Sequence, residues 1–279
     1  MIRLDRSFLL LLLLVVFCNS VKSQNLFNAE NSRKFAGYLF RTQQYNLAAH
    51  EYERILSINP NDTVTFTDLI EAYRLGNSCQ LSFKNMEILN VSSFFKNETL
   101  AAEYLKLTLS CNNYDQANYF SEALSELDLP EQKFYQLGRF VFEEKTDSLI
   151  RFANRNHELL SDKYSLVFSN VKDIANFKRK KPGLAAVMSA IIPGSGKAYT
   201  GYWGDAIMSL VFVSTNAWLS YKGFNKKGIN SANGWIFGSI SMGFYLGNIW
   251  GSGRAAKTYN RTEYESLYND AKNTFYNHF

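Results

Sequence analysis

The tryptophans of this chain are confined to its last third. All four of them, Trp203, Trp218, Trp235 and Trp250, bracket two apolar segments, 206–221 and 235–250, that contain no formal charge. Each pair of rings is fifteen residues apart, which on a helix is about 22 Å and suits aromatic rings at the two interfaces of a bilayer. The sequence therefore predicts an all-α chain with a water-soluble N-terminal part and a transmembrane helical hairpin over 205–252.

Glycines recur at four-residue spacing in the second apolar segment. Gly234 and Gly238 are followed by Gly243, Gly247 and Gly251. Inside a water-exposed helix each would cost roughly 0.8–1 kcal/mol relative to alanine, whereas in lipid glycines let two helix backbones approach closely. We expect the last three to be helix-packing positions, within one hairpin or between two copies in a homo-oligomer. A soluble pair of core helices is the alternative.

The segments on either side of the predicted hairpin differ from it in character. Residues 178–204 begin with four consecutive basic residues, and the short apolar stretch 184–192 follows, between Pro182 and Pro193. Nine residues cannot cross a hydrocarbon core of about 30 Å, so this region reads as a basic linker with an interfacial or re-entrant helix. Residues 253–279 read as a polar C-terminal tail.

The string PGSGKAYTGYWGD resembles a Pro-Gly-x-Gly-x-x-Tyr-x-Gly motif found at the start of the hydrophobic hairpin in a group of poorly characterised bacterial membrane proteins. The resemblance covers about 80 residues and implies a membrane location without a particular activity. A phosphate-binding loop is excluded because Ile191 and Ala198 stand where that motif needs a glycine and a hydroxyl. The matching residues are Pro193, Gly194, Gly196, Tyr199 and Gly201.

The N-terminal part, residues 24–177, has an amphipathic helical pattern with a 34-residue period. This period brings Leu39, Tyr73, Leu107 and Val141 into one column, and it is the period of helix-turn-helix repeats that must stack to bury their apolar faces. The stretch FAGYLFRTQQYNLAAHEYERILSINPND resembles a tetratricopeptide (TPR) unit, with small residues at Ala36 and Ala48. We expect a TPR-like array of about four hairpins closed by a helix over 161–177; an irregular helical bundle is the alternative.

By resemblance to TPR domains, the first helices of the repeats line a concave groove that binds a protein or peptide partner. Cations and aromatic rings mixed in such a groove suit an acidic, partly apolar segment. A solvated helix face with ordinary arginines is the alternative. The terminal-carboxylate clamp of some TPR domains is absent, because Gly37 stands where it needs asparagine. The predicted groove residues are Arg33, Phe40, Arg41, Arg74, Arg139 and Phe142.

The N-terminus has the pattern of a secretory signal peptide, over residues 1–23. Arg3 and Arg6 precede an apolar run, 8–18, that is too short to span a bilayer, and Ser23 suits the cleavage position. An acylated Cys18 and an uncleaved anchor are the alternatives. We therefore expect a protein of the bacterial cell envelope, membrane-anchored, with its repeat domain in the periplasm.

Export makes the loop of the hairpin cytoplasmic. The three lysines of this loop then follow the tendency of basic residues to lie on the cytoplasmic side. The basic cluster 178–181 would lie on the opposite side of the membrane and does not follow this tendency. Anionic lipid headgroups are a suitable partner for that cluster.

No catalytic or metal-binding pattern is present in the sequence. The three histidines are isolated from one another, and no nucleophile elbow or dinucleotide-binding fingerprint occurs. We expect no enzyme activity and no cofactor, and the net charge of +5 without a long basic tract argues against nucleic acid. Cys79 and Cys111 fall near turns of adjacent repeats, where we favour two free thiols over a disulfide.

Two functions fit these features. The first is a non-catalytic scaffold or adaptor, in which the array holds a partner and the hairpin anchors it in the membrane. The second is a component of a transport or protein-insertion complex, in which the hairpin is the working part. Neither apolar segment contains Asp, Glu, Lys, Arg or His, the side chains that mark ion or substrate pathways, and this favours the first function.

Overall fold

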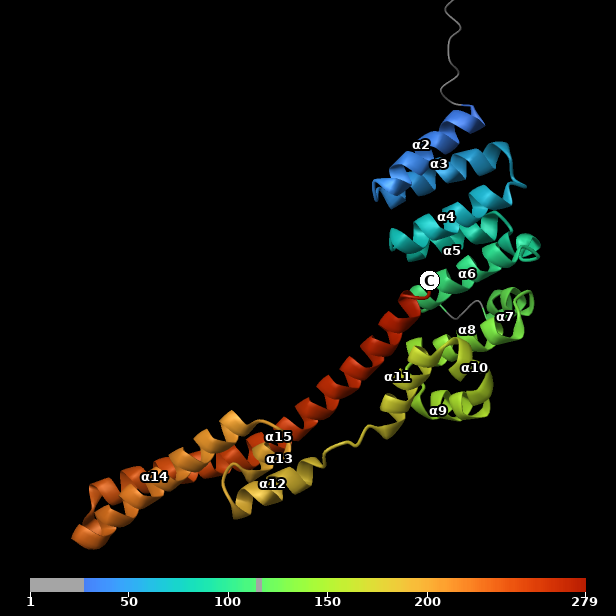
Figure 1. The fold of residues 1–279 in the computed structure, drawn as a ribbon. Coiled ribbons are helices and arrows are strands. Elements are labelled where there is room, and N and C mark those ends of the chain that lie inside the picture. Colours follow the sequence, from blue (N-terminus) through green and yellow to red (C-terminus); the bar gives the residue numbers. More distant parts are fainter. Residues whose placement is uncertain (1–27, 114–116) are drawn as a thin grey trace, which may run out of the picture. The chain divides into compact units, whose positions relative to one another are not determined.

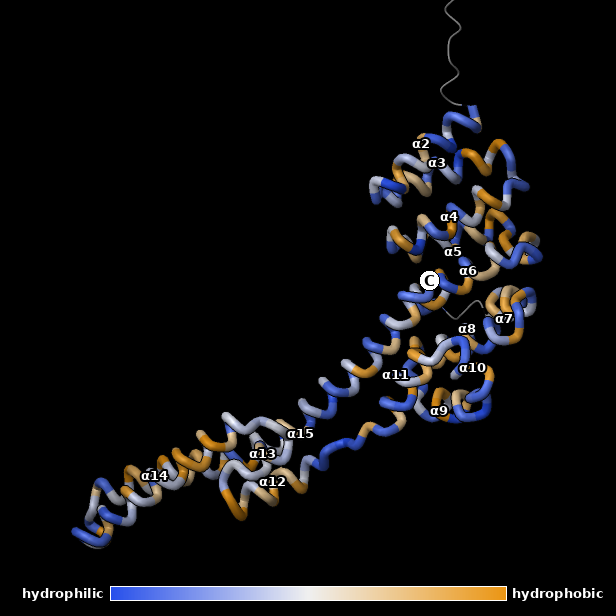
Figure 2. The backbone as a smooth tube through the Cα atoms, in the orientation of Figure 1, coloured by the Kyte–Doolittle hydropathy of each residue, from blue (hydrophilic) through white to orange (hydrophobic). Residues whose placement is uncertain are grey.

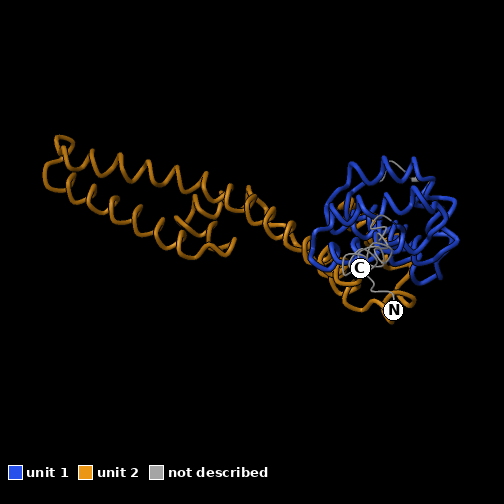
Figure 3. Tube along the Cα trace, turned by 90° about the horizontal axis from the view of Figure 1, so that it is seen from above, with its two compact units in different colours: residues 1–135 blue, residues 136–279 orange. Residues whose placement is uncertain are grey.

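The fold was analysed in a computed structural model, which describes residues 28–113 and 117–279 (Figure 1). Every regular element in this part of the chain is a helix, so the predicted all-α class is confirmed. The predicted signal peptide lies outside the described residues. The chain divides into two compact units, residues 1–135 and 136–279 (Figure 3).

The first unit is a series of short helices connected by tight turns. Each helix packs against a neighbour in the series: α2 on α3, α3 on α4, and α4 on α6. Ala36 and Ala48, the small residues of the first predicted repeat, are both fully buried. The helices are α2 (Ala29–Arg41), α3 (Tyr45–Ile58), α4 (Thr63–Leu75), α5 (Cys79–Ile88), α6 (Glu98–Ser110), α7 (Ala117–Ser125) and α8 (Leu129–Phe142). A 3-10 turn at Val91–Phe94 lies between α5 and α6, and α8 contains the boundary between the two units.

A repeated capping arrangement defines the first helix of each hairpin. Asn28, Asp62, Asn97 and Asp128 each accept a hydrogen bond, 2.7–3.2 Å long, from the backbone N–H three residues later. These side chains satisfy N–H groups that a helix start otherwise leaves unpaired. A residue with left-handed backbone geometry ends the same four helices, at Gln43, Asn77, Asn112 and Glu144. The near-34-residue spacing of both features supports a helical repeat.

Cys79 and Cys111 form a disulfide, so the expectation of two free thiols is wrong. The disulfide joins the first residue of α5 to the residue that caps the end of α6, with a Cα–Cα distance of 5.6 Å. Distances between adjacent repeats had argued against this pairing, but the turns after α4 and α6 bring the two residues together. The bond therefore crosslinks consecutive repeats of the first unit.

The second unit contains five further short helices, α9 to α13, and then a long helical hairpin made of α14 and α15. Figure 2 shows apolar residues along α12, α14 and the first half of α15. Within the described residues, no helix has a stretch that is both long and apolar enough to qualify as a membrane span. The helices are α9 (Thr146–Arg155), α10 (His157–Lys163), α11 (Ser165–Asn176), α12 (Pro182–Ile191), α13 (Ser195–Tyr199), α14 (Trp203–Lys227) and α15 (Ala232–Tyr276), with a 3-10 turn at Gly228–Asn230.

The segment expected to be a polar tail is the second half of α15. Tyr268, Ala271 and Phe275 lie on one stripe of this helix and are each at most 1% exposed. The Tyr268 hydroxyl is 2.9 Å from the Thr146 hydroxyl, and the Asn170 amide donates to the Thr274 hydroxyl over 2.6 Å. This end of α15 therefore belongs to the core of the second unit, together with α9 and α11. Likewise, the predicted closing helix over 161–177 is divided at Tyr164 between α10 and α11.

Candidate functional site

The interior of the hairpin is made of small and polar residues. The buried positions recur every seven residues on both helices, as in a left-handed coiled coil. The Ser220 hydroxyl donates to the Gly234 carbonyl over 2.7 Å, and the Ser241 hydroxyl donates to the Val213 carbonyl over 3.0 Å. These residues let the two backbones approach closely and satisfy their own polar groups. They are Ala206, Val213 and Ser220 on α14, and Gly234, Ser241 and Asn248 on α15.

The outer surface of the hairpin carries its large apolar side chains. All four tryptophans point outward, with exposed fractions between 54% and 69%. Most other bulky apolar residues of the hairpin are also exposed, so the usual arrangement of a water-soluble helix pair is reversed. They include Ile207, Met208, Leu210, Val211 and Phe212 on α14, and Ile236, Ile240, Met242, Phe244 and Leu246 on α15.

The two serine hydrogen bonds fix the register of the hairpin. They lie seven residues apart on each helix, so the same antiparallel register places Trp203 level with Trp250 and Trp218 level with Trp235. The tryptophans thus form two pairs, one at the open base of the hairpin and one near its loop. The Lys222 ammonium lies 3.9 Å from the centre of the Trp218 ring, and the Arg254 guanidinium lies 5.5 Å from that of Trp250. Each tryptophan pair is therefore followed by basic residues, and Asp205 is the one charged residue of α14 between Trp203 and Trp218.

The five residues of the Pro-Gly-x-Gly-x-x-Tyr-x-Gly motif form the compact connection from α12 through α13 to α14. Gly194 and Gly201 have left-handed φ angles of +89° and +87°. A Cβ at Gly194 would lie 2.9 Å from the Ala206 carbonyl carbon, and one at Gly196 would lie 2.7 Å from that of Ala185. Pro193 is half-buried at the start of this turn. The glycines are therefore required by backbone geometry and by close helix approach.

Tyr199 fixes the basic segment that precedes α12. Its hydroxyl accepts a hydrogen bond from the Lys181 backbone N–H over 3.4 Å, and the Lys180 ammonium lies 4.6 Å from the centre of its ring. The motif as a whole thus has a structural role at the base of the hairpin.

A buried polar network joins α12, α13 and α15 beside this motif. The Ser189 hydroxyl lies 2.7 Å from the Ser252 hydroxyl and accepts from the Gly196 N–H over 2.9 Å. The Asn248 side-chain oxygen accepts from the Gly194 N–H over 3.1 Å. Sequence reasoning missed this network; its signal was the isolated polar residues within otherwise apolar segments.

The predicted helix-packing glycines are only partly in contact with other residues. A Cβ at Gly251 would lie 3.6 Å from the Lys197 side chain, but a Cβ at Gly243 or Gly247 would meet no atom of another element within 4 Å. Packing of these two inside the hairpin is therefore wrong, and their contact with another copy stays a prediction. Close approach occurs nearer the loop, where a Cβ at Gly223 would lie 2.7 Å from the Gly234 nitrogen.

Four of the predicted groove residues belong to the first unit, and two of these are already paired. The Arg74 guanidinium lies 3.1 Å from Glu103 and 3.6 Å from Glu71, and its side chain is only 10% exposed. Arg33 pairs with Asp62 and donates to the Thr65 hydroxyl over 2.7 Å. These ion pairs use charge that was expected to bind an acidic ligand.

The carboxyl groups of the first unit titrate in different ways. Burial raises the pKa of Asp68, on α4, and raises that of Glu71, on the same helix, where the nearby Glu103 charge adds to the effect. Burial also tends to raise the pKa of Asp62, but hydrogen bonds from Thr65 and the Arg33 charge lower it overall. Two partly buried carboxyl groups with raised pKa, those of Asp68 and Glu71, therefore lie on α4 beside the paired arginines.

The remaining groove residues fall into two groups. Arg41 is exposed in the last turn of α2, and the Phe40 ring packs edge-on against Tyr45 at 5.3 Å. Arg139 and Phe142 lie in the second unit, where Arg139 pairs with Glu143 at 3.0 Å. Phe142 is only 5% exposed and packs against two rings of α15, so its assignment to a groove is wrong.

No arrangement for metal binding is found in the part of the chain that the structure describes, where no three His, Cys, Asp or Glu side chains are grouped suitably. Comparison with protein-family models, with curated proteins and with solved structures finds no match to this chain.

Proposed function

We propose that this protein is a membrane-anchored scaffold. In this proposal α14 and the first half of α15 are embedded in lipid, and the helical array holds a protein partner next to the membrane. The observation that carries the proposal is the reversed hairpin, with serines, asparagine and glycines inside and bulky apolar side chains outside.

The reversed arrangement suits lipid for two physical reasons. Lipid gives no hydrophobic force between apolar side chains, so helices associate there through small residues and hydrogen bonds. Ser220 and Ser241 supply such bonds. In water, by contrast, monomeric proteins rarely expose a continuous apolar surface of this extent. The average hydropathy of each helix includes its inward polar stripe, but only the outward face meets lipid.

The ends of the hairpin suit the two polar boundaries of a bilayer. One tryptophan pair is followed by Lys222, Lys226 and Lys227, and the other is followed by Arg254 and Lys257. Tryptophan favours the interface, where its ring is in apolar surroundings and its N–H reaches polar groups. The Trp235 N–H donates to the Ile229 carbonyl over 2.9 Å, at the loop.

The array offers a surface for a protein partner on α2. Phe35 and Tyr38 are about half exposed and lie on one side of the helix with the exposed Arg41. Aromatic and arginine side chains are the residues most enriched at protein interfaces. Because Arg33 and Arg74 are already paired, this surface supports a mostly apolar partner segment better than a strongly acidic one.

Lipid embedding is tested by placing a charge on the outer surface of the hairpin. Val211, about midway between Trp203 and Trp218, is 51% exposed. A lysine at the centre of a bilayer costs about 2.5–3.5 kcal/mol, so Val211→Lys should weaken vesicle binding by about a hundredfold. Ile88→Lys, at a 71% exposed position on the array, is the matched control and should bind like wild type. Equal binding of all three proteins, or alkaline extraction of wild type from vesicles, would refute the proposal.

The scaffold role is tested by photocrosslinking in cells. A crosslinking amino acid at Tyr38 should capture a specific protein, and the same group at Ser57, on the exposed surface of α3, should not. Capture only from a position on the hairpin, such as Phe244, would favour the transport or insertion complex instead.

A further inference from the structure

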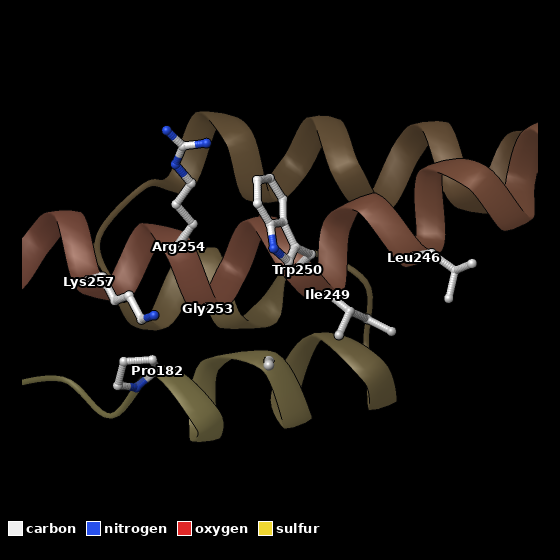
Figure 4. A pocket seen from close by; sticks show the side chains of 8 residues that line it. Pro182, Leu246, Ile249, Trp250, Gly253, Arg254 and Lys257 are labelled. Carbon is white, nitrogen blue, oxygen red and sulfur yellow. The ribbon is translucent and has the colours of Figure 1, made fainter.

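A groove of about 630 Å³ lies between α12 and α15 in the second unit (Figure 4). Its floor forms where the two helices are close, since a Cβ at Gly253 would lie 3.5 Å from the Pro182 carbonyl oxygen. The lining is mostly apolar at one end and carries two cations at the other. The lining residues are Pro182, Ala186, Leu246, Ile249, Trp250, Gly253, Arg254 and Lys257.

The two cations of the groove lack acidic partners. Arg254 and Lys257 are both exposed, and within the described residues neither has a carboxylate within 4.0 Å. Residues 178–262 contain eleven lysines and arginines but a single acidic residue, Asp205. This part of the chain therefore has an excess of positive charge that an anionic ligand would balance.

The start of α12 adds to the positive potential at this end. Lys181 caps the helix without a side-chain hydrogen bond, and Pro182 is its first residue. The first-turn N–H groups of a helix have no acceptors within the helix, and its dipole favours an anion at that end. Asn260 holds this segment against α15, because its side chain accepts from the Lys180 N–H over 2.7 Å and donates to the Lys180 carbonyl over 2.8 Å.

The groove has the polarity of an amphiphile. Its charged end is next to Trp250, which is level with Trp203 at the base of the hairpin, and its apolar residues Leu246 and Ile249 extend toward the middle of the hairpin. We propose that the groove binds an anionic phospholipid, with the phosphate at Arg254, Lys257 and the start of α12, and an acyl chain along Leu246 and Ile249. This inference rests on the proposed embedding of the hairpin in lipid.

Trp250 allows the site to be tested directly, because it is one of the residues that line the groove. In the full chain with the other three tryptophans changed to Phe, its fluorescence would be measured in vesicles that contain phosphatidylglycerol and phosphatidylcholine. Brominated acyl chains, which quench tryptophan, would be placed on one lipid or on the other. Near a membrane, one lysine or arginine contributes about fivefold to the binding of anionic lipid, so two predict a preference for phosphatidylglycerol of roughly twenty- to thirtyfold.

Two charge-matched variants separate a specific site from general attraction. Arg254→Gln with Lys257→Gln should remove the preference at Trp250, whereas Lys226→Gln with Lys227→Gln, at the loop, should preserve it. Equal quenching by both brominated lipids, or loss of the preference in both variants, would overturn the lipid site and leave the embedding intact. Absence of quenching by either lipid would instead refute the embedding itself.

Discussion

Replacing the motif glycines one at a time separates the two physical reasons for glycine in the connection between α12 and α14. Gly201 has a left-handed φ of +87° but no atom near its missing side chain. Gly196 lies within α13 and faces a close carbonyl group. Gly194 combines both conditions, with φ of +89° and the Ala206 carbonyl next to it. Alanine at each position therefore tests a different combination of backbone strain and steric overlap.

The expected costs follow from these environments. Alanine at a left-handed position costs about 1–2 kcal/mol, which a stiffer unfolded chain offsets by about 0.4–1 kcal/mol, so Gly201→Ala should destabilise by about 1 kcal/mol. Overpacking adds about 1–3 kcal/mol. Gly194→Ala should therefore cost about 2–4 kcal/mol, and it also disturbs the hydrogen bond from the Gly194 N–H to Asn248. Gly196→Ala should fall between the two.

Tryptophan emission is a suitable assay, because all four tryptophans lie within residues 203–250 and the first unit has none. Unfolding of the full chain in detergent micelles by denaturant would give the change in free energy for each variant. Gly204→Ala is the control, since Gly204 has neither a positive φ nor an atom within 4 Å of a Cβ. If Gly194→Ala were as mild as Gly201→Ala, the close approach of this turn to Ala206 would be wrong.

Three further predictions concern the first unit. Cys79→Ser should lower the unfolding free energy of this unit by about 3–4 kcal/mol, because the disulfide closes a loop with a sequence separation of 32. Far-ultraviolet circular dichroism during urea unfolding measures this change, and a reductant should lower the stability of wild type but not that of the variant. Arg74→Met leaves Lys106, at 2.5 Å, as the remaining partner of Glu103, and it should lower the unfolding free energy by roughly 2–3 kcal/mol. Adding Glu103→Gln to the same chain should recover most of this loss in the same assay, and no recovery would argue against the pair of Arg74 with Glu103. Burial raises the pKa of Asp68 above its usual 3.8, so the folded state binds that proton more tightly than the unfolded chain does, and the ionised group opposes folding at neutral pH. Asp68→Asn should therefore be more stable than wild type at pH 7, and the difference in unfolding free energy should shrink as the pH falls toward about 4. A difference that widened in acid would contradict the assignment.

Some elements follow from local sequence pattern, and the structure contains them. Ala36 and Ala48 are buried as expected, because paired helices that approach closely leave room only for small side chains. Pro182 begins α12, as the preference of proline for the first turn of a helix would indicate. The capping residues Asn28, Asp62 and Asn97 are also readable from the sequence, as polar residues directly before amphipathic segments.

Other features depend on contacts that no single segment reveals. The pairs Arg33 with Asp62 and Arg74 with Glu103 each join residues 29 positions apart, so the arginines looked available when each helix was considered alone. The second half of α15 is rich in polar residues, which hide the stripe of Tyr268, Ala271 and Phe275 in the sequence. A hydropathy average over a whole helix does not show which face is apolar. In α14, likewise, the average does not distinguish the buried stripe from the apolar outer face.

Because α15 is one continuous helix, Ala232–Tyr276, the directions in which side chains point at its two ends are fixed relative to each other. Ala256, buried near the base of the hairpin, and Tyr268, buried among α9 and α11, stand at a fixed angle because each residue adds about 100° of rotation and 1.5 Å of rise. One inserted residue would turn one end out of register, while seven would nearly restore the angle. The shorter connection 177–181 joins the same two regions. Length changes during evolution are thus expected to come in whole helical turns, and to occur in both connections together.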